Sequence, residues 1–269
     1  MNQIRHAAVA GAFYPGDASV LKRDIQSMLA GVAPAPDASV PKALIVPHAG
    51  YIYSGPIAAS AYARLMPARS RISRVVLLGP VHRVPVRGLA LPGVDSFETP
   101  LGIVPLDLQA MDAIAALPQV VESMPAHAWE HSLEVQLPFL QMVLDKFSLV
   151  PLAVGDATPR EVAEVLQVLW GGEETLIVIS SDLSHYLPYD TARRVDHGTA
   201  QAILELAAPV SHEQACGGTP VNGLLVAARH HHLQPQLLDL RNSGDTAGDR
   251  SQVVGYGAFA FFENPTHVH

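Results

Sequence analysis

The sequence contains only one cysteine, Cys216, in 269 residues. A single thiol cannot form a disulfide within the chain, so Cys216 is a buried apolar residue, a redox-sensitive thiol, a nucleophile or a metal ligand. No CxxC pattern is present to decide between these roles. The chain does contain thirteen histidines, and this abundance makes a metal site worth considering.

Basic residues are also scarce, because 17 Lys and Arg stand against 25 Asp and Glu, for a formal net charge of −8. This balance gives no electrostatic reason for binding a phosphate backbone, and we expect no nucleic-acid partner. No uninterrupted apolar run reaches the ~20 residues of a membrane span, and the first residues lack a basic region followed by an apolar one. We therefore expect no membrane association and a cytoplasmic location.

What the sequence does contain is a series of short runs rich in Val, Ile and Leu, which alternate with segments of helical periodicity. The runs show little internal alternation, as expected of strands covered on both faces, and their alternation with helices predicts a sheet flanked by helices. We expect strands at 43–47, 74–79, 149–154, 175–180 and 253–262, and helices at 20–29, 107–117, 159–170, 190–208 and 220–231. The last strand is expected to pair antiparallel at the sheet edge, which makes the sheet mixed. The length fits one domain over residues 1–269.

Three local signals predict where helices begin and end. Thr158 and Glu161 have the spacing of a capping box, and Gly171 follows the same helix as a stop signal. Pro138 lies inside the apolar pattern of residues 133–144 and should either kink that helix or mark its true start.

Polar residues follow three of the predicted strands, at the point where each strand ends. His48 follows the first strand, His82 the second, and Asp182 and His185 the fourth. Ligands of open α/β sheets gather just beyond the carboxyl ends of the strands. Polar residues at these positions are therefore stronger candidates for a functional site than polar residues elsewhere. A lone histidine at a strand end is more often a hydrogen-bonded structural residue, but three equivalent positions favour a shared site.

Two histidines and a thiolate make a plausible three-ligand metal site with open positions, because imidazole binds Fe, Zn or Cu and a thiolate adds a softer, charged ligand. Cys216 is followed by Gly217 and Gly218 before a predicted helix. An electropositive helix start favours a reactive or ligating cysteine over an inert one.

Asp182 and His185 are three residues apart and would share a face if the segment turned helical. The carboxylate could then orient the imidazole for general acid/base work, whereas the structural alternative is that Asp182 caps the next turn. A similar choice concerns His131 and Glu134, which form either an active-site wall or a helix start with a surface carboxylate. We favour His131 as functional, because a histidine at the entrance of an apolar helix would point toward the same strand ends.

Six motifs occur in order along nearly the whole chain: VAGAFYPGD from Val9, VPHAGYIYSG from Val46, LLGPVH from Leu77, WEHSLEVQLPFL from Trp129, SSDLSHY from Ser180 and CGGTPV from Cys216. With these motifs the sequence resembles the Memo-like family, whose bacterial and archaeal members are called AmmeMemoRadiSam system protein B. The family is related in fold to class III extradiol dioxygenases. The resemblance implies a three-layer α/β/α sandwich with a mixed central sheet.

The resemblance also implies a metal site. It places the family ligands on His48, His82 and Cys216, and the neighbours of the metal on Asp182 and His185. Fe(II) is the first expectation for the metal, with Cu or Zn as alternatives. The related dioxygenases have a carboxylate as the third ligand, whereas Cys216 is oxidisable, so ring cleavage cannot simply be carried over.

Two functions from different classes remain open at this point. The first is a metal-dependent oxidoreductase acting on a small molecule or peptide, with His185, Asp182 and His131 in catalytic roles. The second is a non-catalytic metal- or peptide-binding regulatory protein that uses a dioxygenase-like cleft. The family name further implies a pathway link to radical-SAM and AMMECR1-like proteins. Zinc-dependent hydrolysis is disfavoured, because the sequence lacks a phosphate loop and an acyl-transfer triad.

Overall fold

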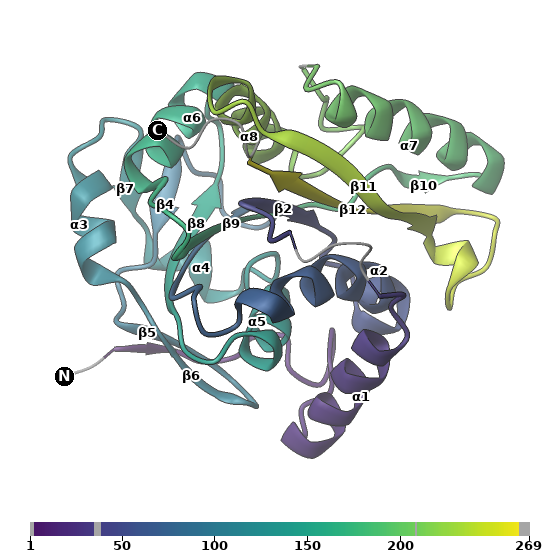
Figure 1. Cartoon of the computed structure of the whole chain (residues 1–269), viewed down its shortest axis with the longest axis horizontal. Helices are drawn as coiled ribbons and strands as arrows, with labels where there is room; N and C mark the ends of the chain where they lie inside the picture. Colours follow the sequence, from purple (N-terminus) through teal and green to yellow (C-terminus); the bar gives the residue numbers. More distant parts are fainter. Residues whose placement is uncertain (1–2, 35–38, 208, 264–269) are drawn as a thin grey trace.

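A mixed sheet forms the centre of the computed structural model, which describes residues 3–34, 39–207 and 209–263 (Figure 1). In these residues the main sheet has nine strands in the order β10-β12-β2-β9-β3-β8-β4-β7, with β11 also paired to β12. The strands are β2 (Ala43–Val46), β3 (Arg74–Pro80), β4 (Leu89–Leu91), β7 (Val120–Glu122), β8 (Ser148–Val154), β9 (Thr175–Ser180), β10 (His185–Leu187), β11 (Gln234–Asn242) and β12 (Val253–Phe262). A separate small sheet joins β1 (Ile4–Arg5), β5 (Ser96–Thr99) and β6 (Gly102–Pro105).

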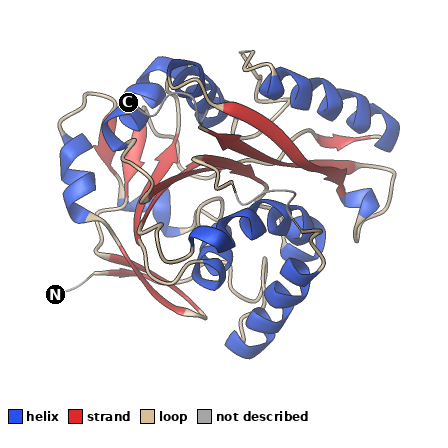
Figure 2. Ribbon diagram, in the orientation of Figure 1, coloured by secondary structure: helices blue, strands red, loops and turns tan. Residues whose placement is uncertain are grey.

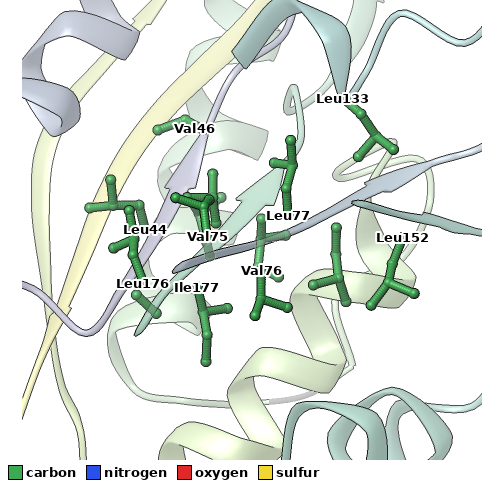
Figure 3. Packing of buried hydrophobic residues seen from close by; sticks show 14 of the residues in the cluster. Leu44, Val46, Val75, Val76, Leu77, Leu133, Leu152, Leu176 and Ile177 are labelled. Carbon is green, nitrogen blue, oxygen red and sulfur yellow. The ribbon is translucent and has the colours of Figure 1, made fainter. Parts of the chain in front are cut away.

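The four central strands β2, β9, β3 and β8 run parallel, and every residue of β2 and β9 is buried. Burial on both faces explains why these segments read as continuous apolar runs in the sequence. Their side chains pack into one core, in which Leu44, Val76 and Ile177 lie close together (Figure 3). β12 pairs antiparallel with β2, and β4 pairs antiparallel with β8, so the sheet is mixed as predicted.

The prediction that the last strand lies at the sheet edge is wrong. β12 has β2 on one side and both β10 and β11 on the other. The small residues Gly255, Gly257 and Ala258 of β12 are buried between these neighbours. A strand of ten residues offers enough backbone for β10 and β11 to pair along different parts of the same edge.

Helices cover both faces of the sheet and produce three layers (Figure 2). One layer contains α1, α2 and α5, and the other contains α6, α7 and α8 (Figure 1). The helices are α1 (Ala18–Ala30), α2 (Tyr51–Tyr62), α3 (Leu108–Ala115), α4 (Met124–Ala128), α5 (Leu137–Val143), α6 (Pro159–Leu169), α7 (Tyr189–Leu204) and α8 (Gly218–His230), with 3-10 turns η1 (Ala63–Ala68), η2 (Glu134–Gln136) and η3 (Ser243–Asp245). The expected α/β/α sandwich is confirmed.

The helix start and stop signals read from the sequence are found at the ends of the observed helices. Thr158 and Glu161 exchange both hydrogen bonds of a capping box at the start of α6, and Gly171 adopts a left-handed φ of 58° just after it. Pro138 lies in the first turn of α5 and marks its start. The helix predicted to reach residue 208 ends at Leu204, where Leu206 turns left-handed with a φ of 53°, and residue 208 itself lies outside the described residues.

Helix α2 was not predicted, because Gly55 and Pro56 interrupt its pattern. The structure gives Gly55 a packing role, since a Cβ at this position would lie 2.4 Å from the sulfur of Met28 in α1. The glycine therefore allows two helices to approach closely, at a cost in helix propensity of about 1 kcal/mol. None of the helices in the described ranges is both long and apolar enough to cross a membrane.

Candidate metal centre

Three strand ends bring the predicted site residues to one edge of the sheet. β2, β9 and β3 are parallel neighbours, so His48, Asp182 and His82 leave the sheet at the same side. His131 reaches this point from the loop between α4 and η2, and Cys216 from the segment just before α8. The described residues thus place side chains from five segments around one point, and three of these segments are the strand ends singled out from the sequence.

Three imidazoles form the closest group of candidate ligands. The ligand nitrogens of His48, His82 and His131 all lie within 4.8 Å of one another. Two nitrogens bound to one ion at about 2.1 Å lie no more than about 4.2 Å apart, so the spacing is close to what a single ion requires. The donor set therefore fits a transition metal, and His131 belongs to it by distance although the sequence gave it a catalytic role.

His48 is buried and its ring orientation is determined by Ser180. The Ser180 hydroxyl donates its one proton to the carbonyl of Ser132 at 2.6 Å, so it accepts from Nδ1 of His48 at 2.9 Å. This leaves the lone pair of His48 on Nε2, the nitrogen that lies 3.4 Å from Sγ of Cys216. Burial, followed by the proximity of His82, lowers the pKa of His48 to about 3, so the imidazole is neutral and ready to act as a ligand.

His82 is oriented by Glu130, a residue that sequence reasoning did not single out. The Glu130 carboxylate accepts from the backbone N–H of His82 at 2.6 Å and from its Nδ1 at 2.9 Å. It also accepts from the N–H groups of His131 and Ser132, at 2.9 and 3.0 Å. Burial by itself raises the pKa of Glu130, but the hydrogen bonds from His82 and Ser132 outweigh it and lower the pKa to about 2.

His131 packs between two rings, with its centroid 4.6 Å from those of Phe13 and His82. Burial, then the neighbouring His48 and His82, lowers its pKa to about 4. His131 also lies four residues after His127, but His127 does not belong to the histidine group. His127 is buried and its Nε2 donates to the carbonyl of Ala90 at 2.7 Å.

Cys216 approaches the histidine group at His48, and its thiol also contacts the carbonyl of Asp182 at 3.7 Å. The helix start does not make this thiol acidic, because burial and then the Asp182 carboxylate raise its pKa to about 12. Without a cation the sulfur therefore keeps its proton. Gly217 allows this segment to lie against β9, since a Cβ there would lie 2.7 Å from that of Ser181.

The helical turn that would place Asp182 and His185 on one face does not form. Residues 181–184 are irregular, and His185 begins β10, which pairs with β12. Asp182 is buried and accepts from the backbone N–H of His48 at 2.7 Å, while burial raises its pKa. His185 bonds through Nδ1 to the carbonyl of Leu183 at 2.8 Å. Its ring is thus oriented by a backbone acceptor, and Asp182 supports the loop that carries His48.

Glu134 is a buried carboxylate, contrary to the alternative that places it on the surface. It forms an ion pair with Arg5 and accepts from the backbone N–H groups of Ala8 and Val9 and from the hydroxyl of Tyr14. Arg5 also donates to the carbonyl of Glu130 at 2.7 Å. This network anchors the N-terminal segment to the loop that carries Glu130 and His131, and the large sequence separation of its members hid it from sequence reasoning.

A cavity of about 470 Å³ opens beside the histidine group, with His131, Asp182 and His185 in its wall. Tyr53 lies in the same wall, whereas Tyr51 is buried and Trp129 is 67% exposed outside it. Of these three aromatic residues, only Tyr53 lines this cavity. The arrangement combines neutral imidazoles, a thiol and a space large enough for a small molecule.

Comparison with known proteins gives matches along almost the whole chain. A family model described as Memo-like protein matches residues 5–260. A MEMO1 family protein of Aquifex aeolicus is 38% identical, with 96% of this chain and 99% of that protein covered. One from Archaeoglobus fulgidus is 36% identical, with the same two shares covered. An uncharacterized protein from Escherichia coli K12 has a similar fold, with a TM-score of 0.50, 16% identity, and 80% of this chain and 98% of that chain covered.

Proposed function

The chain belongs to the Memo-like family, and on this basis we propose that it is a metal-dependent oxidoreductase with its metal held by His48, His82 and Cys216. The observation that carries the proposal is the convergence of three imidazoles and the only thiol at the strand ends beside a cavity. Fe(II) is the proposed metal, with Cu or Zn as alternatives. Bound iron would supply one-electron redox chemistry and an open position for a substrate oxygen.

His131 is proposed as an additional nitrogen ligand rather than as an acid or base. Its ligand nitrogen is within 4.8 Å of those of His48 and His82, and its low pKa keeps it neutral. Four protein donors leave an octahedral ion with two open positions. That count suits a metal centre that must also bind substrate.

His185 is proposed as the residue that moves a proton. Its Nδ1 must carry a hydrogen in order to donate to the carbonyl of Leu183, so Nε2 has the free lone pair. The side chain lines the cavity, where it is available to a bound molecule. Asp182 has a supporting part, because its hydrogen bond to the backbone of His48 holds the strand end in place.

Metal analysis tests the ligand assignment. Protein purified without oxygen should contain close to one equivalent of metal, and His48→Ala or Cys216→Ser should lower that content, whereas His197→Ala on the exposed side of α7 should leave it unchanged. Full metal content in His48→Ala would contradict the site. Total metal should be measured separately for iron, copper and zinc in each sample, since the donor set alone accepts all three.

A second candidate function is a metal- or peptide-binding regulatory protein without turnover, which the aromatic residues of the cavity wall support as well. Dioxygen uptake with candidate catechols separates the two. Uptake by the iron-loaded protein that is lost in His185→Gln supports the oxidoreductase, while none in a correctly loaded sample supports the binding protein. A cytoplasmic location and a pathway link to radical-SAM and AMMECR1-like proteins remain predictions of the sequence.

A further inference from the structure

The cavity beside the histidine group has an aromatic wall. Phe13, Tyr53, Tyr186 and Tyr256 line it together with the site residues His131, Asp182 and His185. Phe13 contacts the ring of His131 with 4.6 Å between centroids, so the aromatic wall begins at the metal site itself. Flat aromatic faces around a space of this size are typical of a site for a ring or a cationic group.

Tyr186 reaches the cavity through an unusual backbone conformation. Its φ of 56° is left-handed, a region that residues other than glycine rarely adopt, and it lies where the pairing of β10 with β12 shifts register. The side chain is 68% exposed, although a tyrosine normally gains by packing. Such local strain is retained where the surrounding structure requires it, often at ligand sites.

The charges of the wall have one sign. Its two carboxylates are Asp182, next to the histidine group, and Asp249, in the loop between η3 and β12. Neither Lys nor Arg is among the residues that line it. Arg250 is next to Asp249 in sequence, but its guanidinium lies over the ring of Tyr189 at 4.4 Å and its Nε points to the carbonyl of Gly244.

A bound metal ion would change the negative charge of the cavity wall only at the end next to the histidine group. Its two positive charges would be offset there by the Cys216 thiolate and by the nearby carboxylates of Asp182 and Glu130. Asp249 belongs to a different segment, and its carboxylate accepts hydrogen bonds from the backbone and hydroxyl of Ser251. The part of the wall formed by Asp249 and Tyr186 thus remains acidic and aromatic whether or not the metal is bound.

We propose that the cavity binds an aromatic compound that presents an oxygen donor to the metal and an ammonium group to Asp249 and the tyrosines. The inference rests on the proposed metal function, which it deepens by naming the ligand class. A carboxylate or phosphate beside Asp249 and Tyr186 would be repelled by the Asp249 carboxylate, and no Lys or Arg lines the cavity to pair with it. An ammonium there gains an ion pair and cation–π contacts with tyrosine faces.

Matched phenols test this inference by titration calorimetry of metal-loaded and metal-free protein. Tyramine and 4-hydroxyphenylacetate share the phenol and carry opposite charges at the far end of a short chain. We expect tyramine to bind at least about tenfold more tightly, as one favourable contact of about 1.4 kcal/mol would give. Asp249→Asn and Tyr186→Leu should each reduce that preference.

The control concerns net charge, because a chain with a formal charge of −8 attracts any cation weakly. Asp190→Asn on the exposed start of α7 removes the same charge outside the cavity and should leave the preference unchanged. Equal or tighter binding of 4-hydroxyphenylacetate by metal-loaded protein, or no binding of either phenol at millimolar concentration, overturns the inference and leaves the metal site standing. If the protein cannot be loaded with metal but still prefers tyramine, the proposed metal function is overturned and the preference of the cavity for an ammonium group stands.

Discussion

The carboxylate of Glu130 holds His82 at two points, through the backbone N–H and through Nδ1 of the ring. A carboxylate can only accept, so Nδ1 carries the hydrogen and Nε2 presents its lone pair to the histidine group. The same carboxylate accepts from the backbone of His131 and Ser132. One buried side chain therefore ties together the two loops that supply candidate ligands.

Glu130→Gln should weaken metal binding by about 10- to 100-fold while the protein stays folded. The glutamine amide group would face N–H donors that now meet carboxylate oxygens, so the orientation of His82 would be lost. Competition with a chromophoric chelator measures the affinity. Glu173→Gln, at an exposed position, is the matched control, and an unchanged affinity in Glu130→Gln would show that His82 is held by other means.

Absorption spectra of the cobalt-substituted protein can test Cys216 and His131 separately as metal ligands. Cys216→Ser should abolish the near-ultraviolet charge-transfer absorption that a thiolate ligand produces. His131→Gln should keep that absorption but shift the visible bands, because one nitrogen donor is lost. Identical visible spectra of wild type and His131→Gln would exclude His131 as a ligand.

Metal affinity should rise with pH, and Cys216 determines the slope. The thiol has a pKa raised to about 12 in the absence of metal, so below that pH a bound ion must displace its proton. His48 and His131, with pKa values of about 3 and 4, are already neutral above pH 5 and release nothing. We expect about a tenfold gain in affinity per pH unit between pH 6 and 9, and a clearly shallower slope in Cys216→Ser.

Arg5→Met should lower the free energy of unfolding by about 3–5 kcal/mol, because it leaves the buried carboxylate of Glu134 without its cation. Denaturant titration measures the loss. Arg69→Met breaks an ion pair with Asp145 whose two side chains are about half exposed, and it should cost only about 0–1 kcal/mol. Similar losses in the two variants would mean that the Arg5–Glu134 pair is not desolvated.

Two glycine substitutions should act in opposite directions. Gly217→Ala places a methyl group 2.7 Å from Cβ of Ser181 and should push the Cys216 segment away from β9, lowering both stability and metal affinity. Gly198→Ala lies in α7 with nothing within 4 Å of the new Cβ, and should raise stability by about 0.5–1 kcal/mol. Thermal unfolding of both proteins provides the comparison, and a neutral Gly217→Ala would contradict the close contact.

The sheet could be predicted from sequence where burial on both faces produced continuous apolar runs. Two strands, Thr175–Ser180 and Val253–Phe262, have the bounds expected. β11 was missed because its residues are mostly half-buried and their pairing with β12 determines the strand. Local signals such as the Thr158 capping box were reliable, since all of their partners lie within four residues.

The sequence by itself determined that His48 and His82 follow parallel strands, and that Cys216 is the only thiol available to them. Only the tertiary structure decided that His131 joins the two histidines, that Glu130 orients His82, and that Asp182 holds the backbone of His48 instead of orienting His185. These contacts join residues between 48 and 134 positions apart. Periodicity and capping report only on near neighbours in the chain, whereas the packing of loops over the sheet edge brings such distant side chains within hydrogen-bonding distance.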